Sequence, residues 1–84
     1  MKIAVAQKEK FDKEKIKDAI DIAGSAVKLA RILGVGVVAV YAWVHGRSAP
    51  DPINCLKIQK ATGGKIKARD IRPDYEWDKV LPDE

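Results

Sequence analysis

The sequence predicts a single, mainly α-helical domain of four to five helices that contains a helix-turn-helix. Three observations support this fold class. The chain has 84 residues, which is enough for one domain. Charged residues make up 33% of it and hydrophobic residues 46%, the balance of a globular protein. Most of its apolar residues recur at helical spacing, in segments that begin at capping residues and end at glycines.

The N-terminal end is open to two interpretations. Ile3 and Val5 alternate with other residues in the first six positions, which is compatible with a short strand or with an arm. The obvious strand partner is residues 65–67. We therefore divide the chain into an arm or short strand at 1–11, a helix-turn-helix domain at 12–75 and an acidic tail at 76–84.

The first two helices are predicted from their caps. Asp12 is a good N-cap for the first helix, and Gly24 ends it. Ser25 caps the second helix, which Gly34 ends. The apolar stripe of the first helix consists of Ile16, Ala19, Ile20 and Ala23, and that of the second of Ala26, Leu29, Ala30 and Leu33.

Two further helices follow. Residues 37–45 are apolar at nearly every position, and Gly46 ends this segment. Asp51 caps the fourth helix, Pro52 is its first residue, and Gly63 and Gly64 end it.

Residues 26–45 have the pattern of a helix-turn-helix. Two helices are joined by a turn of about three residues, and small Ala30 stands where the helices must approach closely. Gly34 opens the turn, where the backbone needs a positive φ that a Cβ would penalise. Val35, Val40 and Trp43 are predicted to face inward.

Charge is distributed unevenly along the chain. The net charge of +4 comprises +1 for residues 1–25, +7 for residues 26–72 and −4 for residues 73–84. A concentrated basic block is typical of proteins that bind nucleic acids, although a solvated surface rich in Lys would look the same.

The sequence gives little support for a disulfide, a metal site, catalysis or a membrane span. Cys55 and His45 are each the single residue of their type, so we expect no disulfide, metal or cofactor, and Cys55 is interpreted as a buried, inert thiol. No constellation of catalytic residues can be assembled, so we expect neither an enzyme nor a small-molecule substrate. The longest nearly apolar run, residues 32–44, is shorter than the roughly 18–20 residues of a membrane span. We therefore expect a cytoplasmic, nucleoid-associated protein that binds no membrane.

Most of the chain, residues 24–75, resembles the phage Cro-like and YdaS-like antitoxin group of helix-turn-helix proteins. This resemblance implies a compact, lambda-repressor-like domain that represses transcription at a phage or bacterial operator on double-stranded DNA. The residues that carry it are Leu33-Gly34-Val35, Ala39-Val40, Trp43, Gly46, Pro50, Cys55-Leu56, Ile58, Ala61-Thr62-Gly63-Gly64 and Arg69-Asp70-Ile71-Arg72-Pro73-Asp74.

The resemblance also implies which residues contact DNA. The group reads bases with the second helix of the motif, and phosphates are held by residues around it. The corresponding base-contacting positions are Gly36, Val37, Val38, Tyr41, Ala42 and His45. If this helix enters the major groove, the phosphate contacts expected from the residues around the motif are Ser25, Lys28, Arg31, Arg47, Lys57 and Lys60. The usual two-fold symmetry of such regulators adds the expectation of a homodimer on a pseudo-palindromic site.

This sequence departs from the group on the surface that would read the bases. Hydrogen-bond donors common there are missing, which leaves Tyr41 and His45 as polar readers. Three interpretations remain open. The apolar face enters the major groove and selects thymine methyl groups; it is buried in a contact with another protein or subunit; or residues 36–44, rich in β-branched side chains, do not form a full helix. The second would make the chain a protein-interaction module that has kept the helix-turn-helix fold.

Overall fold

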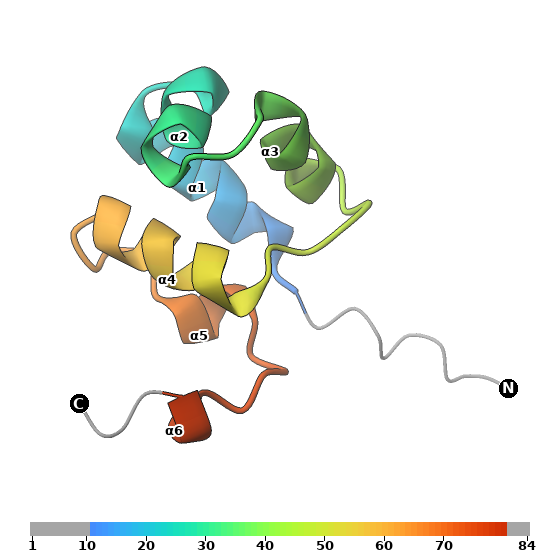
Figure 1. Cartoon of the computed structure of the whole chain (residues 1–84), viewed down its shortest axis with the longest axis vertical. Helices are drawn as coiled ribbons and strands as arrows, with labels where there is room; N and C mark the ends of the chain where they lie inside the picture. Colours follow the sequence, from blue (N-terminus) through green and yellow to red (C-terminus); the bar gives the residue numbers. More distant parts are fainter. Residues whose placement is uncertain (1–10, 81–84) are drawn as a thin grey trace, which may run out of the picture.

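The computed structural model describes residues 11–80, which form six α-helices and no strand (Figure 1). The predicted mainly helical fold is confirmed, with one helix more than the upper expected number in this part of the chain. The helices are α1 (Lys13–Ala23), α2 (Ala26–Leu33), α3 (Val37–Val44), α4 (Pro52–Ala61), α5 (Ala68–Ile71) and α6 (Trp77–Val80).

The four predicted helices correspond to α1 to α4, and their predicted N-caps are confirmed. Gly24 and Gly34 end α1 and α2 as predicted, whereas the C-caps of α3 and α4 are His45 and Thr62, just before the predicted glycines. The Asp12 side chain accepts a hydrogen bond from the Glu14 N–H at 3.0 Å, and Ser25 Oγ accepts one from the Lys28 N–H at 3.1 Å. Asp51 caps α4 in the same way. Each cap satisfies an amide at a helix start that has no partner within its helix.

The predicted pairing of the first six residues with residues 65–67 has no support in the described region. Residues 65–67 lie in a bend between α4 and α5 and form no strand. Ile3 and Val5, the other half of the prediction, lie outside the described residues. The suggested arm or strand therefore stays a prediction.

The first three helices pack on one another and enclose most of the core, with α4 and α5 closing its other side (Figure 1). Burial of apolar side chains is the main source of stability in such a small domain. The buried side chains are Ile16 and Ala19 of α1, Ala26, Leu29, Ala30 and Leu33 of α2, Val40 and Trp43 of α3, Cys55 and Ile58 of α4, and Ile66, Ala68, Ile71 and Trp77 beyond it.

Polar contacts fasten α4 and α5 to the rest of the domain. Buried Thr62 donates its hydroxyl to the Ile58 carbonyl at 2.9 Å and accepts from the Ile66 N–H at 3.1 Å. The Gln59 side chain accepts from the Ala68 N–H at 2.8 Å and so caps α5 from a distance. The Asp12 N–H donates to the Ile71 carbonyl at 2.9 Å, which joins the start of α1 to the end of α5.

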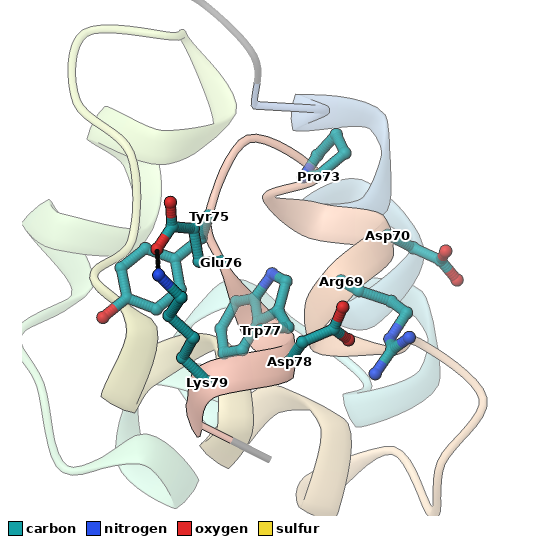
Figure 2. Close-up of a pocket in the computed structure, with 8 residues that line it drawn as sticks. All are labelled: Arg69, Asp70, Pro73, Tyr75, Glu76, Trp77, Asp78 and Lys79. Atoms are coloured by element: carbon teal, nitrogen blue, oxygen red, sulfur yellow. Dashed lines mark ion pairs between the residues drawn. The ribbon is translucent and has the colours of Figure 1, made fainter. Parts of the chain in front are cut away.

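The segment after α5 folds back on the domain. The Trp77 indole donates to the Arg72 carbonyl at 2.7 Å, and Trp77 is buried. Tyr75 meets Trp77 edge-on with ring centroids 4.9 Å apart but keeps an exposed surface. Figure 2 shows these two rings beside an open pocket of about 550 Å³. Its lining is completed by Arg69, Asp70, Pro73, Glu76, Asp78 and Lys79.

Candidate nucleic-acid interface

The segment α2–turn–α3 has helix-turn-helix geometry. The chain bends by 117° between the two helices, at the upper end of the 90–120° range typical of the motif. Gly34 ends α2 in the left-handed conformation, with φ of 76°. The N–H groups of Gly34 and Val35 both donate to the Ala30 carbonyl, at 2.8 and 3.0 Å. These contacts cap α2 and fix the direction in which α3 leaves the turn.

Ala30 of α2 is the small residue expected at the crossing of the two helices. It is buried, and α2 and α3 are in contact with each other. Leu29 and Leu33 on α2 and Val40 and Trp43 on α3 fill the surrounding core. The motif is therefore held by the core of the domain and presents α3 in a defined orientation.

All of Val37–Val44 is helical, so the interpretation that this segment is not a full helix is wrong. The β-branched side chains are tolerated because half of the helix is packed against α1 and α2. Gly36 precedes α3 as N-cap and offers no side chain to its first amides.

One side of α3 remains outside the core. Val38 is 77% exposed and Tyr41 47% exposed, whereas Val40 and Trp43 are buried. The positions 38, 41, 42 and 45 follow the spacing that places residues on one helix face. His45 is exposed and Ala42 half-buried, so four of the predicted base-contacting residues share this outer side. We call Val38, Tyr41, Ala42 and His45 the outer face of α3.

The other two predicted base-contacting residues are placed differently. Val37 is half-buried and packs against the core, and Gly36 is the N-cap. The sequence contained a signal for this difference, because Val37, Val40 and Val44 have the spacing of one helix side.

The predicted phosphate contacts fall into two groups. Lys28 and Arg31 are exposed on α2, Arg47 is exposed just after α3, and Lys60 is exposed in the last turn of α4. Ser25 and Lys57 already have partners. Ser25 Oγ caps α2, and Lys57 Nζ donates to the Leu33 carbonyl at 3.2 Å.

Lys57 thus has a structural contact that the sequence analysis missed. Its ammonium group lies at the C-terminal end of α2, where a cation is favoured by the free carbonyls and the helix dipole. The contact ties α4 to the start of the turn. No local pattern indicates it, because Lys57 and Leu33 are 24 residues apart in the chain.

The stretch of chain that contains the motif carries only positive charges. Residues 22–50 contain no Asp or Glu and carry Lys28, Arg31 and Arg47. The acidic side chains of α1 precede this stretch, and the described tail acids follow α5. A surface of this kind attracts the phosphate backbone of nucleic acids.

Cys55 is a buried thiol, as predicted. Its side chain has no exposed surface, and Sγ donates to the Pro50 carbonyl at 3.6 Å. Burial raises the pKa of this thiol to about 12, because the thiolate would lose its hydration.

Residues 11–80 contain no group of three His, Cys, Asp or Glu residues placed to hold a metal ion. Within the same residues, no single helix is long and apolar enough to cross a membrane; α2 and α3 pass that test jointly, by length and composition, as a sharply bent pair.

Comparisons with known proteins agree with this geometry. Residues 16–80 match the family described as bacterial toxin YdaS. The chain is 33% identical over 61 residues to the "Putative transcriptional regulator YdaS" of Escherichia coli (strain K12), covering 73% of this chain and 62% of that protein. It is 31% identical over 62 residues to the regulatory protein cro of Pseudomonas phage D3, covering 74% of this chain and 85% of that protein. The match thus spans less than two thirds of the length of the YdaS protein. No solved structure matches significantly.

Proposed function

The chain belongs to the family described as bacterial toxin YdaS, and from this membership and the geometry of α2 and α3 we propose that it is a DNA-binding transcriptional regulator. The finer proposal is a Cro-like repressor that acts at a phage or bacterial operator. The family is described as a toxin, whereas the two curated relatives are named as regulators. We follow the relatives' names because the helix-turn-helix offers a surface suited to DNA.

The observation that carries the proposal is the exposed outer face of α3, set at 117° to α2 in a stretch without acidic residues. An α-helix fits the major groove of B-DNA, and α3 is free of core contacts on the side that would enter it. Lys28 and Arg31 on α2 and Arg47 after α3 are the exposed cations of this stretch. In the proposed complex they hold phosphates and orient the motif.

The other predicted contact residues are assigned roles in the same proposed complex. Val38, Tyr41, Ala42 and His45 face the base edges, with Gly36 and Val37 at the start of the helix. Lys60 adds a phosphate contact, while Ser25 and Lys57 contribute mainly through the contacts that hold α2. The functional unit is a homodimer on a pseudo-palindromic operator, since two-fold symmetric regulators match two half-sites. Such a protein acts at the nucleoid and needs no cofactor.

Arginine substitutions test the docking. Arg31→Ala and Arg47→Ala should each weaken binding to all duplexes about equally and reduce the slope of log K against log salt by about one. The measurement is a titration of labelled duplex DNA at several salt concentrations.

Lys79→Ala is the matched control. Lys79 lies on α6, at the opposite end of the molecule from α3 (Figure 1), and pairs with Glu76 just before that helix. An unchanged slope in both arginine variants, or an equal change in the Lys79 variant, would contradict the proposed docking.

A protein-interaction module is the second candidate function. The observation that favours it is the apolar character of the outer face, because exposed Val38 and Tyr41 could equally be covered by another protein. This candidate predicts that Val38→Asp or Tyr41→Asp abolishes a protein complex, and that duplex DNA does not bind even at low salt.

A further inference from the structure

The outer face of α3 offers the bases almost no hydrogen-bond donors or acceptors. Its most exposed apolar side chain is Val38, at 77%, followed along the helix by Tyr41, whose ring is also apolar. Ala42 adds a methyl group, and the polar atoms of the face are the Tyr41 hydroxyl and the His45 imidazole. In the major groove, the 5-methyl group of thymine is the apolar feature of the base edges.

Building on the proposed function, we propose that Val38 and Tyr41 select the 5-methyl group of pyrimidines in the major groove. The preferred DNA therefore carries thymine opposite these two side chains. The same ring position is methylated in 5-methylcytosine, which presents an identical group in the groove. The sequence preference then comes from apolar contact rather than from bidentate hydrogen bonds.

Charge identifies DNA rather than a second copy of this chain as the occupant of the face. Lys28, Arg31 and Arg47 belong to the same stretch as α3, and residues 22–50 contain no acidic side chain to neutralise them. A two-fold symmetric contact through this face would bring two copies of these cations together. The phosphate backbone supplies the opposite charge on both sides of the groove.

Val38 rather than Val37 is the side chain that discriminates. Val37 is half-buried against the core, so its surface is largely used by packing. Most of the surface of Val38 is exposed, so its methyl groups contribute little to packing within the domain. Substitution of Val38 should therefore change DNA preference while leaving the fold intact.

The expected effect is modest and can be calculated from transfer energies. Burying one methyl-sized group is worth about fourfold in a binding constant. By comparison, a side chain that makes two hydrogen bonds to its preferred base discriminates against the wrong base by about fivefold to more than a hundredfold in the binding constant. Methyl selection should therefore give differences of about fourfold for each methyl group in contact with the helix.

Four short duplexes test this proposal. Alternating A-T and alternating A-U deoxyribose duplexes differ by the thymine methyl groups, and alternating G-C and G-5-methylcytosine duplexes differ by the same group on another base pair. Binding constants are measured at low salt with the full chain, Val38→Ala, and Ile53→Ala as the control. Ile53 is an exposed apolar residue of α4, at 61% exposure, and belongs to neither helix of the motif.

We expect the methylated duplex of each pair to bind about fourfold or more tightly to the full chain and to Ile53→Ala, and this ratio to fall toward one in Val38→Ala. Equal binding within both pairs, or a ratio unchanged in Val38→Ala, would overturn methyl selection while leaving DNA binding intact. A methyl effect confined to the A-T and A-U pair would also overturn it, because duplex shape would then explain the difference. If none of the four duplexes binds, the proposed function itself fails.

Discussion

Val37 and Val38 are identical neighbours that serve different purposes. The first packs against the core, and the second is among the most exposed apolar residues in the described part of the chain. Their difference arises from the helical period, which turns successive residues by about 100°. At this scale a single position decides whether a methyl group stabilises the fold or is available to a ligand.

Gly34 and Gly36 show the same contrast in the backbone. Gly34 has φ of 76°, which side chains with a Cβ rarely adopt, whereas Gly36 has φ of −76° and ψ of 151°. A Cβ at either position would meet nothing within 4 Å, so backbone conformation alone distinguishes them. The two glycines are therefore a matched pair.

We expect Gly36→Ser to raise the free energy of unfolding by about 0.5–1 kcal/mol, because Ser would cap α3 and restrict the unfolded chain. Gly34→Ser should lower it by about 1 kcal/mol, since Ser would be held in a left-handed conformation. Urea denaturation measures both. Shifts of the same sign in the two variants would show that the turn is not built as described.

At the scale of elements, we expect the angle between α2 and α3 to depend on the small side chain of Ala30. Ala30 is buried and belongs to the same core cluster as Leu29 and Leu33 of α2 and Val40 and Trp43 of α3. Larger side chains at such a site force neighbouring groups out of their preferred rotamers. The position of α3 is thus determined inside the core and not by the surface that would contact DNA.

Ala30→Leu should destabilise the domain by about 1–3 kcal/mol through overpacking at this crossing. Thermal or urea unfolding measures the loss. Val27→Leu is a suitable control, because Val27 lies on the same helix but is exposed and should change stability by less than about 0.5 kcal/mol. A melting temperature unchanged in Ala30→Leu would contradict the described packing of α2 against α3.

Local signals were sufficient for four helices and insufficient for the other two. Asp12, Ser25 and Asp51 are N-caps that act within three residues of themselves, so a sequence pattern reveals them. The one-turn helices α5 and α6 depend on distant or irregular contacts. Gln59 caps α5 from nine residues away, and the Trp77 indole bonds the Arg72 carbonyl.

The candidate site, like the helices, was predictable where local sequence patterns determine it. The helix-turn-helix follows from Ala30 and Gly34, and the outer face of α3 follows from helical spacing. The contact of Lys57 with the end of α2 could not be predicted, because it exists only after α4 has packed against α2. Charge alone suggested a phosphate contact there, whereas geometry assigns Lys57 a role in holding the motif.

At the scale of the whole molecule, charge is separated along the chain. The block of +7 in residues 26–72 contains α2 to α5, and the excess of acids in residues 73–84 conceals it in the net charge of +4. The described part of that acidic segment is held at the end of the domain remote from α3, by Trp77 and by the bidentate pair of Arg72 with Asp74 (Figure 1). This arrangement keeps acidic groups away from the surface proposed to meet DNA.

The salt dependence of DNA binding shows most directly whether this chain docks on the phosphate backbone of DNA. A labelled duplex is titrated with the full chain at several salt concentrations, and log K is plotted against log salt. Contacts with about five phosphates predict a straight line with a slope near −4 to −5. An absence of binding at low salt, or binding that does not change with salt, would contradict the account of this chain as a helix-turn-helix protein that docks on DNA.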